Sequence, residues 1–295
     1  MLPCWYAPRN RQGCTAALVF IHTPGNLLLA PQSTNRLSKL YGRDMKILAF
    51  FAHPDDETML AGGTLALLAY SGSQVYYLSA TRGEGGEVGE PPRCKVEELG
   101  QVRAEELACA VHALEGVSLT CLAYADPSVG PGNEMYPFTT NLAMLSGQIA
   151  AKIREYQVDA LITHGSNGEY GHPAHVLCHR AARLSVTSFG DQAPLMYTVQ
   201  AAFDGHPHPR LANRDDPAHL ILDVTPVLRY KTRAALCHRT QFALFVRRSS
   251  KLAGRRTKVP EVIMRVESLH RAIPSTDGEL DDPLARALRP WLLKT

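Results

Sequence analysis

The sequence lacks a long apolar run and lacks any closely spaced pair of cysteines. No apolar segment approaches the roughly 20 residues that a membrane-spanning helix needs, so the sequence predicts a soluble protein without a membrane span. The seven cysteines are odd in number, and none forms a CxxC pair. Cys109, Cys121 and Cys178 lie in apolar contexts, where cysteine behaves as a small hydrophobic residue. We therefore expect a reducing compartment, the cytoplasm.

Two catalytic signatures are also missing. The sequence has no GxSxG motif, which argues against a serine hydrolase of the α/β-hydrolase kind. Glycines at positions 83, 85, 86 and 89 lack the spacing of a dinucleotide-binding loop, and the interleaved Glu84 and Glu87 would repel a pyrophosphate. The glycine-rich segment therefore does not indicate a nicotinamide cofactor.

Most of the 295 residues alternate between short apolar runs and longer amphipathic segments. Strands that alternate with helices predict an α/β protein, here a Rossmann-like three-layer fold with a mostly parallel sheet and helices on both faces. The expected strands are Lys46–Phe51, Gln74–Leu78, Leu119–Tyr124, Ala160–Thr163, Leu195–Ala201 and His219–Val224. The expected helices are Glu57–Ala69, Val96–Leu114, Thr139–Tyr156 and Pro173–Ser185.

Composition divides the chain into unequal parts. Residues 1–44 read as a poorly ordered N-terminal extension, and residues 45–295 as one domain with a basic C-terminal segment from about residue 225. Between residues 225 and 272, twelve Lys or Arg face two Glu, a net charge of +10. Within that segment we expect Val246–Lys258 to be a solvated loop or, as the second choice, the mouth of a site for an anionic substrate. Nucleic-acid binding is not expected, because no aromatic residues interleave the charges.

Polar residues that could hold a metal ion follow two of the predicted strands. His53-Pro54-Asp55-Asp56-Glu57 follows the first strand, and His172 and His175 lie three residues apart at a helix start after the fourth. Strand ends of a parallel sheet meet at one edge, and two histidines with a carboxylate form a catalytic zinc set with an open position. The alternatives are helix capping by the acids and ordinary surface or core histidines.

The sequence resembles the LmbE-like, or PIG-L, family of zinc-dependent N-acetylglucosaminyl deacetylases, over about Met45 to Phe242. The resemblance rests on motifs that occur in the same order, namely KILAFFAHPDDE from Lys46, TRGEGGEV from Thr81, Arg103–Leu107, YGHPAH from Tyr170, and Lys231 with His238–Gln241.

The resemblance implies a set of roles. His53, Asp56 and His175 would hold the metal, zinc or else iron. Asp55 would be the general base. His172 as an imidazolium and Tyr170 would stabilise the oxyanion.

Arg93 and Asp126 are candidate substrate contacts. Glu57 and His164 are expected beside the ligands rather than among them.

One position departs from the family pattern. Many relatives have Asp between the two histidines, where this chain has Ala174. That Asp would orient or charge His172, so Glu169 or another acid is expected to take its place. The expected activity is removal of the N-acetyl group from a glucosamine-containing small molecule, a glycoside or thiol-cofactor precursor.

Two alternatives stay open for the activity. One is an amidase that acts on a non-acetyl conjugate, and the other is a metal-dependent sugar-binding module without catalysis. An anionic substrate and a homo-oligomer also stay open.

Overall fold

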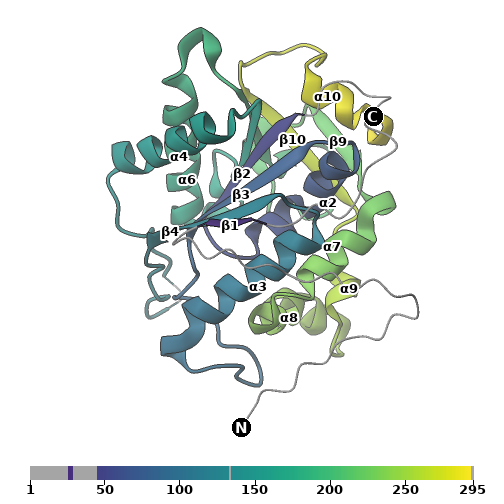
Figure 1. Cartoon of the computed structure of the whole chain (residues 1–295). Helices are drawn as coiled ribbons and strands as arrows, with labels where there is room; N and C mark the ends of the chain where they lie inside the picture. Colours follow the sequence, from purple (N-terminus) through teal and green to yellow (C-terminus); the bar gives the residue numbers. More distant parts are fainter. Residues whose placement is uncertain (1–25, 29–44, 133, 294–295) are drawn as a thin grey trace, which may run out of the picture.

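The fold is built on one large, mostly parallel sheet (Figure 1). The computed structural model describes residues 26–28, 45–132 and 134–293. In these residues the eight-stranded sheet has the order β1-β4-β3-β2-β5-β6-β10-β9, in which β4, β3, β2, β5 and β6 run parallel. The strands are β1 (Asn26–Leu28), β2 (Lys46–Phe51), β3 (Gln74–Thr81), β4 (Ser118–Tyr124), β5 (Ala160–Thr163), β6 (Leu195–Val199), β9 (Leu220–Asp223) and β10 (Val266–Ile273).

Helices cover both faces of the sheet, which confirms the predicted three-layer α/β fold. On one face lie α2 (Asp56–Tyr70), α3 (Leu99–Ala113), α7 (Leu228–Ala235) and α10 (Pro283–Leu288), and on the other lie α4 (Leu142–Tyr156) and α6 (Pro173–Thr187). In β2, Ile47 and Ala49 pack toward the first face while Leu48 and Phe50 pack toward the second. Alternate side chains of a strand point to opposite faces, so an all-apolar strand is what a doubly covered sheet requires.

The predicted central elements agree closely with the structure, whereas the elements after residue 200 were incompletely predicted. Strand β10 was not predicted at all, although it lies in the interior of the sheet between β6 and β9. Its Glu267, His270 and Arg271 hide the apolar pattern by which a strand is recognised. A small second sheet pairs β7 (Ala201–Ala202) with β8 (Asn213–Pro217), which was also missed.

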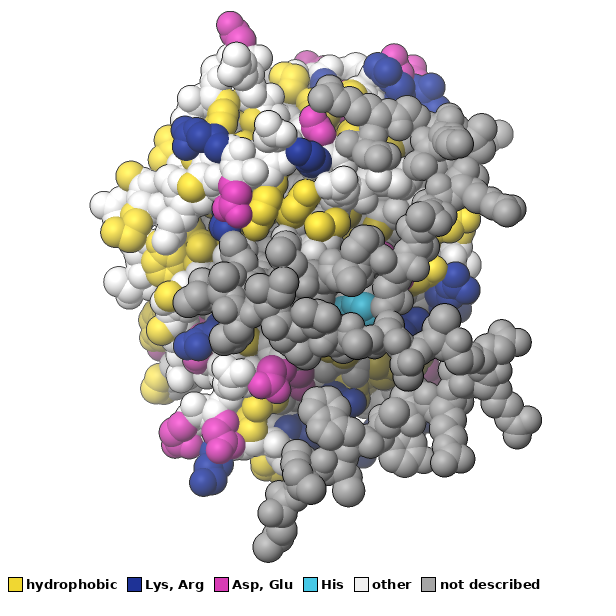
Figure 2. Space-filling model, in the orientation of Figure 1, with side chains coloured by type: hydrophobic (Ala, Val, Ile, Leu, Met, Phe, Trp, Pro, Cys, Tyr) yellow, Lys and Arg dark blue, Asp and Glu magenta, His cyan; other side chains and the backbone are white. Residues whose placement is uncertain are grey.

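The expectation that Val246–Lys258 forms a solvated loop is wrong for most of this segment. Residues up to Ala253 belong to α8 (Phe242–Ala253), which packs through Phe245 and Val246 against α9 (Val259–Val262). Arg247, Arg248 and Lys251 occupy the exposed face of this amphipathic helix, and the other three basic residues of the segment follow it. On the face that Figure 2 shows, Lys and Arg side chains lie scattered among acidic and apolar ones rather than gathered in one patch.

The cysteine prediction is also corrected. Cys109 of α3, predicted to be a small hydrophobic residue, forms a disulfide with Cys237 just after α7. The disulfide joins two helices on one face of the sheet, across 128 residues of sequence. The cysteines therefore no longer indicate a reducing compartment, and the cytoplasmic location stays a prediction without that support.

The predicted N-terminal extension lies almost entirely outside the described residues. Its one described part, β1, pairs antiparallel with β4 at the edge of the sheet. Within the described chain, none of the helices has both the length and the apolar character that crossing a bilayer demands.

A buried ion pair fastens α7 to the sheet and to α2. Lys231 of α7 is fully buried, and its Nζ donates to Oε1 of Glu267 on β10 at 2.6 Å. The same carboxylate accepts from the backbone N–H groups of Gly63 and Thr64 at 2.8 and 2.7 Å, in the middle of α2. Glycine is required at this point of α2, because a Cβ on Gly63 would lie 2.4 Å from Cβ of Val224.

We expect Lys231→Met to lower the free energy of unfolding by about 3–5 kcal/mol, because it leaves Glu267 buried without its cation. Urea denaturation followed by circular dichroism measures the change. The control is Lys251→Met, which removes an exposed lysine of α8 and should change stability by less than about 0.5 kcal/mol. A Lys231→Met protein as stable as the control would show that the ion pair does not fasten these elements.

Candidate metal centre

Histidines and carboxylates from several strand ends meet at the carboxyl edge of the parallel sheet. His53 follows β2, Asp126 follows β4, and His164 follows β5. Asp56 is the first residue of α2, and His175 lies in the first turn of α6. Four of these side chains are buried, namely His53, Asp56, His164 and His175. The cluster is therefore part of the interior of the fold and not a chance grouping on the surface.

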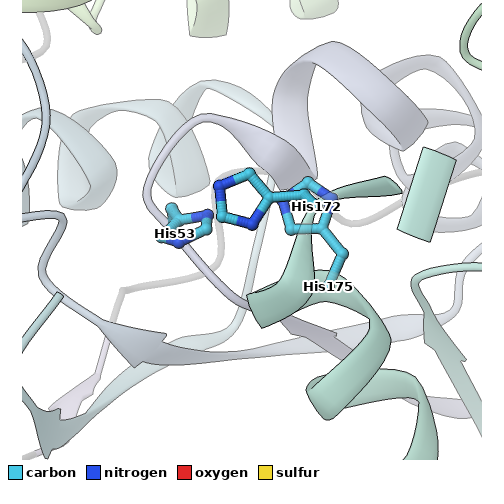
Figure 3. Close-up of side chains that lie close together, drawn as sticks. All are labelled: His53, His172 and His175. Atoms are coloured by element: carbon cyan, nitrogen blue, oxygen red, sulfur yellow. The ribbon is translucent and has the colours of Figure 1, made fainter. Parts of the chain in front are cut away.

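Three of these side chains bring potential ligand atoms close to one another. Oδ2 of Asp56 lies 3.2 Å from Nδ1 of His53 and 3.3 Å from Nε2 of His175. Ligand atoms on a tetrahedral zinc ion, each about 2.0–2.1 Å from it, lie roughly 3.3 Å apart. Nε2 of His175 is buried and has no hydrogen-bond partner among the described residues, as expected of an atom kept for a metal. Figure 3 shows the side chains of His53, His172 and His175 lying close together.

Asp126 is placed to orient His53. Its Oδ1 lies 3.2 Å from Nε2 of His53, the nitrogen that faces away from Asp56. A carboxylate on one ring nitrogen keeps the proton there and leaves the other nitrogen for a metal. Asp126 was predicted as a substrate contact, and that role stays a prediction, but its contact in this structure is with the histidine.

Two groups of potential ligands share His175: one joins it to His53 and His172, and the other joins it to Asp56 and His164. His164 belongs to the second of these groups. Its Nε2, however, accepts a hydrogen bond from the backbone N–H of Ala52 at 3.0 Å, and its Nδ1 lies 3.0 Å from Glu169. Both ring nitrogens of His164 are therefore held by Ala52 and Glu169, whereas Nδ1 of His53 faces Asp56, itself a potential ligand. The predicted ligand set of His53, Asp56 and His175 thus stays a prediction, with His164 beside it.

Glu169 connects the two buried histidines, a contact that the sequence pattern did not reveal. Its Oε2 lies 2.6 Å from Nδ1 of His175 and 3.0 Å from Nδ1 of His164. Its Oε1 accepts from the backbone N–H of Gly165 at 2.9 Å and from the side-chain amide of Asn213 at 3.2 Å. With every oxygen engaged, Glu169 holds His175 with Nε2 directed at Asp56. Glu169 was expected to compensate for Ala174 at His172, but the structure directs it to His164 and His175 instead.

The charges of the cluster suit a divalent cation. Burial lowers the pKa of His53, but hydrogen bonds to Asp126 and Asp56 outweigh it and raise the pKa to about 9. Burial is likewise outweighed at His175, where Asp56 and Glu169 raise the pKa to about 10. Burial raises the pKa of Asp56, but the charge of His175 holds that pKa well below its usual range. The acids are therefore stabilised by positive charge on the neighbouring histidines. In this structure protons supply that charge, and a bound metal ion would displace the protons and supply it instead.

Asp55 stands beside the cluster in a strained backbone conformation. Its φ is 102°, in the left-handed region, and its side chain does not cap α2, which argues against the capping interpretation. Burial raises the pKa of Asp55 to about 6, against the opposing charge of Arg103. Arg103 donates to Oδ2 of Asp55 at 3.2 Å, to O of Pro54 at 2.6 Å and to O of Gly83 at 2.9 Å. The sequence suggested no role for Arg103, which here holds the candidate base and the glycine-rich loop together.

Glu57 and His238 form a further buried pair behind Asp55. Nε2 of His238 lies 3.0 Å from Oε1 of Glu57, and Oε2 of Glu57 accepts from the backbone N–H of Asp55 at 2.9 Å. Glu57 thus orients the backbone of Asp55, in line with its expected place beside the ligands.

His172 and Tyr170 lie on the solvent side of the cluster. The ring of His172 stacks on that of His175 with centroids 4.5 Å apart, and Tyr170 lies edge-on to His172 at 5.7 Å. Nδ1 of His172 accepts from the backbone N–H of Ala174 at 3.2 Å, and burial together with His175 lowers the pKa of His172 to about 3. The ring is neutral in this structure, and its role as an imidazolium stays a prediction. Ala174 is fully buried in the core beneath α6, so its side chain faces away from the site.

Arg93 is not brought into the cluster. Its side chain is exposed, and within the described part of the chain it makes no hydrogen bond or ion pair with the residues named above. Its role as a substrate contact therefore stays a prediction. The preceding loop is held instead by Gln241, which donates to O of Glu87 at 2.8 Å, and by Arg247, which pairs with Glu87 at 2.7 Å.

Comparison with known proteins shows that part of this chain is similar to one family. Residues 48–186 match the family model described as PIG-L: GlcNAc-PI de-N-acetylase. A 1D-myo-inositol 2-acetamido-2-deoxy-alpha-D-glucopyranoside deacetylase of Catenulispora acidiphila is 35% identical over 167 residues, which are 51% of this chain and 47% of that protein. The similarly named protein of Streptomyces avermitilis is 33% identical over 163 residues, 51% of this chain and 55% of that one. The chain therefore spans about half the length of these relatives.

Solved structures share the fold at low sequence identity. The 4-carboxy-2-hydroxymuconate hydratase of Pseudomonas putida is 20% identical, with a TM-score of 0.54 over 80% of this chain and 100% of that one. The N,N'-diacetylchitobiose deacetylase of Pyrococcus horikoshii is 18% identical, with a TM-score of 0.53 over 79% and 86% of the two chains. The fold thus supports more than one kind of reaction, and the choice between them depends on the site.

We expect Glu169→Gln to weaken metal binding by about 10–100-fold, because the amide cannot accept from both His164 and His175. Competition with a chromophoric chelator measures the affinity. The control, Glu97→Gln, changes an exposed glutamate near the start of α3 and should leave the affinity unaltered. Equal affinities for the two variants would contradict the role of Glu169 in orienting His175 for the metal.

Proposed function

We propose that this chain, whose residues 48–186 match the PIG-L (LmbE-like) family model, is a metal-dependent N-deacetylase. The substrate class is a glucosamine-containing small molecule, from which hydrolysis removes the acetyl group as acetate and leaves a free amine. One observation carries the proposal: Nδ1 of His53, Oδ2 of Asp56 and the unpartnered Nε2 of His175 converge beside the Asp55 carboxylate. The names of the relatives support the substrate class.

His53, Asp56 and His175 would hold the metal ion, zinc in the first instance and iron in the second. When bound, such an ion polarises the amide carbonyl and lowers the pKa of water to about 7. The chain's own contribution is to fix the ligand atoms before binding. Asp126 orients His53, and Glu169 orients His175.

Asp55 is the residue proposed to move the proton. As a carboxylate it takes a proton from the attacking water and later gives one to the departing amine. Its pKa of about 6 places it near the range in which a base both accepts and returns a proton at neutral pH. Arg103 and the backbone geometry hold the carboxylate in place, so little reorganisation is needed during the reaction.

Tyr170 and His172 are proposed to stabilise the oxyanion of the tetrahedral intermediate. Both lie on the open side of the cluster, and the phenol stays protonated because burial raises the pKa of Tyr170. A well-placed donor of this kind contributes roughly 3–4 kcal/mol to the transition state. The non-catalytic sugar-binding alternative gives no reason for a half-buried carboxylate beside the candidate metal site, which Asp55 provides.

We expect Asp55→Asn to retain the metal and to lower kcat by about 10²–10⁴-fold, because the amide cannot take the proton. Asn tolerates the left-handed backbone of Asp55, so the loop should keep its shape. Acetate release from N-acetylglucosamine glycosides measures the rate, and atomic emission measures the metal. The control is Asp191→Asn, an exposed acid in the turn after α6. Full turnover by the Asp55→Asn protein would contradict the proposed mechanism.

The size of the acyl group that is hydrolysed fastest distinguishes a deacetylase from the alternative amidase. N-acetyl and larger N-acyl glucosamine glycosides are compared by kcat/KM with the metal-loaded protein. A deacetylase hydrolyses the acetyl compound faster, since each extra methylene that fits a pocket poorly costs roughly 1–3 kcal/mol, or 10–200-fold. Faster hydrolysis of the larger acyl group would favour the amidase.

A further inference from the structure

A cavity of about 410 Å³ opens directly beside the metal centre. Glu169 and Tyr170 line one side of it, and the segment that carries Arg210, Arg214 and Asp215 lines the other. Because Glu169 also holds His175, the cavity and the cluster share a wall. A volume of this size suits a small-molecule substituent rather than a macromolecule.

The cavity is lined by two arginines that lack acidic partners. Within the described residues, neither Arg210 nor Arg214 forms an ion pair or a side-chain hydrogen bond, and both are exposed. The acids nearby are already engaged, since Asp215 accepts from Nδ2 of Asn167 at 2.6 Å and Glu169 serves the two histidines. Two free guanidinium groups in one concavity are a recognition element for a carboxylate or a phosphate.

The segment that presents Arg214 is firmly anchored. Asn213 is fully buried and accepts from the backbone N–H of Glu169 at 3.0 Å. Asp216 is also buried and accepts from the backbone N–H of Ser166 at 2.9 Å and from Oγ1 of Thr198 at 2.8 Å. Arg214 therefore lies between two fixed points, so binding an anion costs little ordering of the backbone.

The Val246–Lys258 segment does not line this cavity. Arg247 is paired with Glu87 and Glu90, at 2.7 and 3.4 Å. The residues that would bind an anionic substrate are therefore Arg210 and Arg214 rather than those of Val246–Lys258. The charge pattern did not single them out, because both precede the basic segment.

We propose that Arg210 and Arg214 bind an acidic substituent, a carboxylate or a phosphate, on the aglycone of the glucosamine substrate. The inference rests on the proposed function, which places the amide at the metal centre. The acidic group then occupies the cavity on the far side of Tyr170. The substrate class is narrowed from glucosamine derivatives in general to those with an acidic aglycone.

The test measures binding of product amines, which are not turned over. The carboxymethyl glycoside of glucosamine is compared with its neutral carboxamide, and the 2-phosphoethyl glycoside with the 2-hydroxyethyl one. Each is titrated into the metal-loaded full-length protein by calorimetry at low ionic strength. We expect at least one acidic glycoside to bind about tenfold or more tightly than its neutral partner, as charge-assisted hydrogen bonds allow. The pair that shows the preference identifies carboxylate or phosphate.

The preference must depend on the two arginines. In Arg210→Gln/Arg214→Gln the ratio of acidic to neutral affinity should fall to about 1–2, because both guanidinium groups are gone. The control, Arg180→Gln/Arg183→Gln, removes the same charge from the exposed face of α6 and should keep the native ratio. An unchanged ratio in the Arg210→Gln/Arg214→Gln protein, or no acidic preference in the native one, would overturn the inference.

Failure of this inference and failure of the proposed function give different results. If no N-acetyl compound releases acetate but the arginine-dependent preference persists, the proposed function fails and the anion subsite stands. If acetate is released with equal kcat/KM from acidic and neutral glycosides and their amines bind equally, the subsite fails and the deacetylase stands.

Discussion

The carboxylate of Glu169 fixes the metal centre. One oxygen meets Nδ1 of His164 and of His175, and the other meets the backbone of Gly165 and the amide of Asn213. A buried carboxylate with so many partners stays charged, and its pKa is held far below its ordinary range, chiefly by His164 against the effect of burial. The end of β5, the start of α6 and strand β8 are thereby brought to one point. His175 is left with one free nitrogen, and that nitrogen faces Asp56.

The fold supplies the other constraints at a distance from the site. Parallel strands end at a common edge, so residues far apart in the sequence become neighbours there. Buried charges then lock the surrounding elements, with Arg103 joining the His53–Glu57 turn to the glycine-rich loop and Lys231 joining α7 to β10 and α2. Burying such a charge costs free energy unless a partner of opposite charge or a hydrogen-bonding group is buried with it. Of these charges, Arg103 contacts Asp55 directly and helps to hold it in its left-handed conformation.

Sequence reasoning predicted the central sheet because it follows a local pattern, and a similar pattern singled out His53, Asp56 and His175, which the structure brings together. KILAFF is apolar on both faces, and HPDDE gathers acids that a helix start alone does not require. The roles of Glu169, Asn213 and Arg103 could not be read in this way, since each depends on partners from 5 to 49 residues away. Strand β10 was missed because its charged residues interrupt the apolar pattern of a strand. Their partners come from other elements, as in the pair of Glu267 with Lys231 of α7. The disulfide between Cys109 and Cys237 was also missed, because the apolar context of Cys109 predicted a small hydrophobic residue there.

The central proposal is that His53, Asp56 and His175, with Glu169 behind them, would hold one metal ion. Anomalous diffraction at the zinc edge from crystals of the zinc-loaded protein tests it most directly. The account predicts a single peak about 2 Å from Nδ1 of His53, Oδ2 of Asp56 and Nε2 of His175. A peak ligated by His164 in place of His53, or no peak in this cluster, would contradict it.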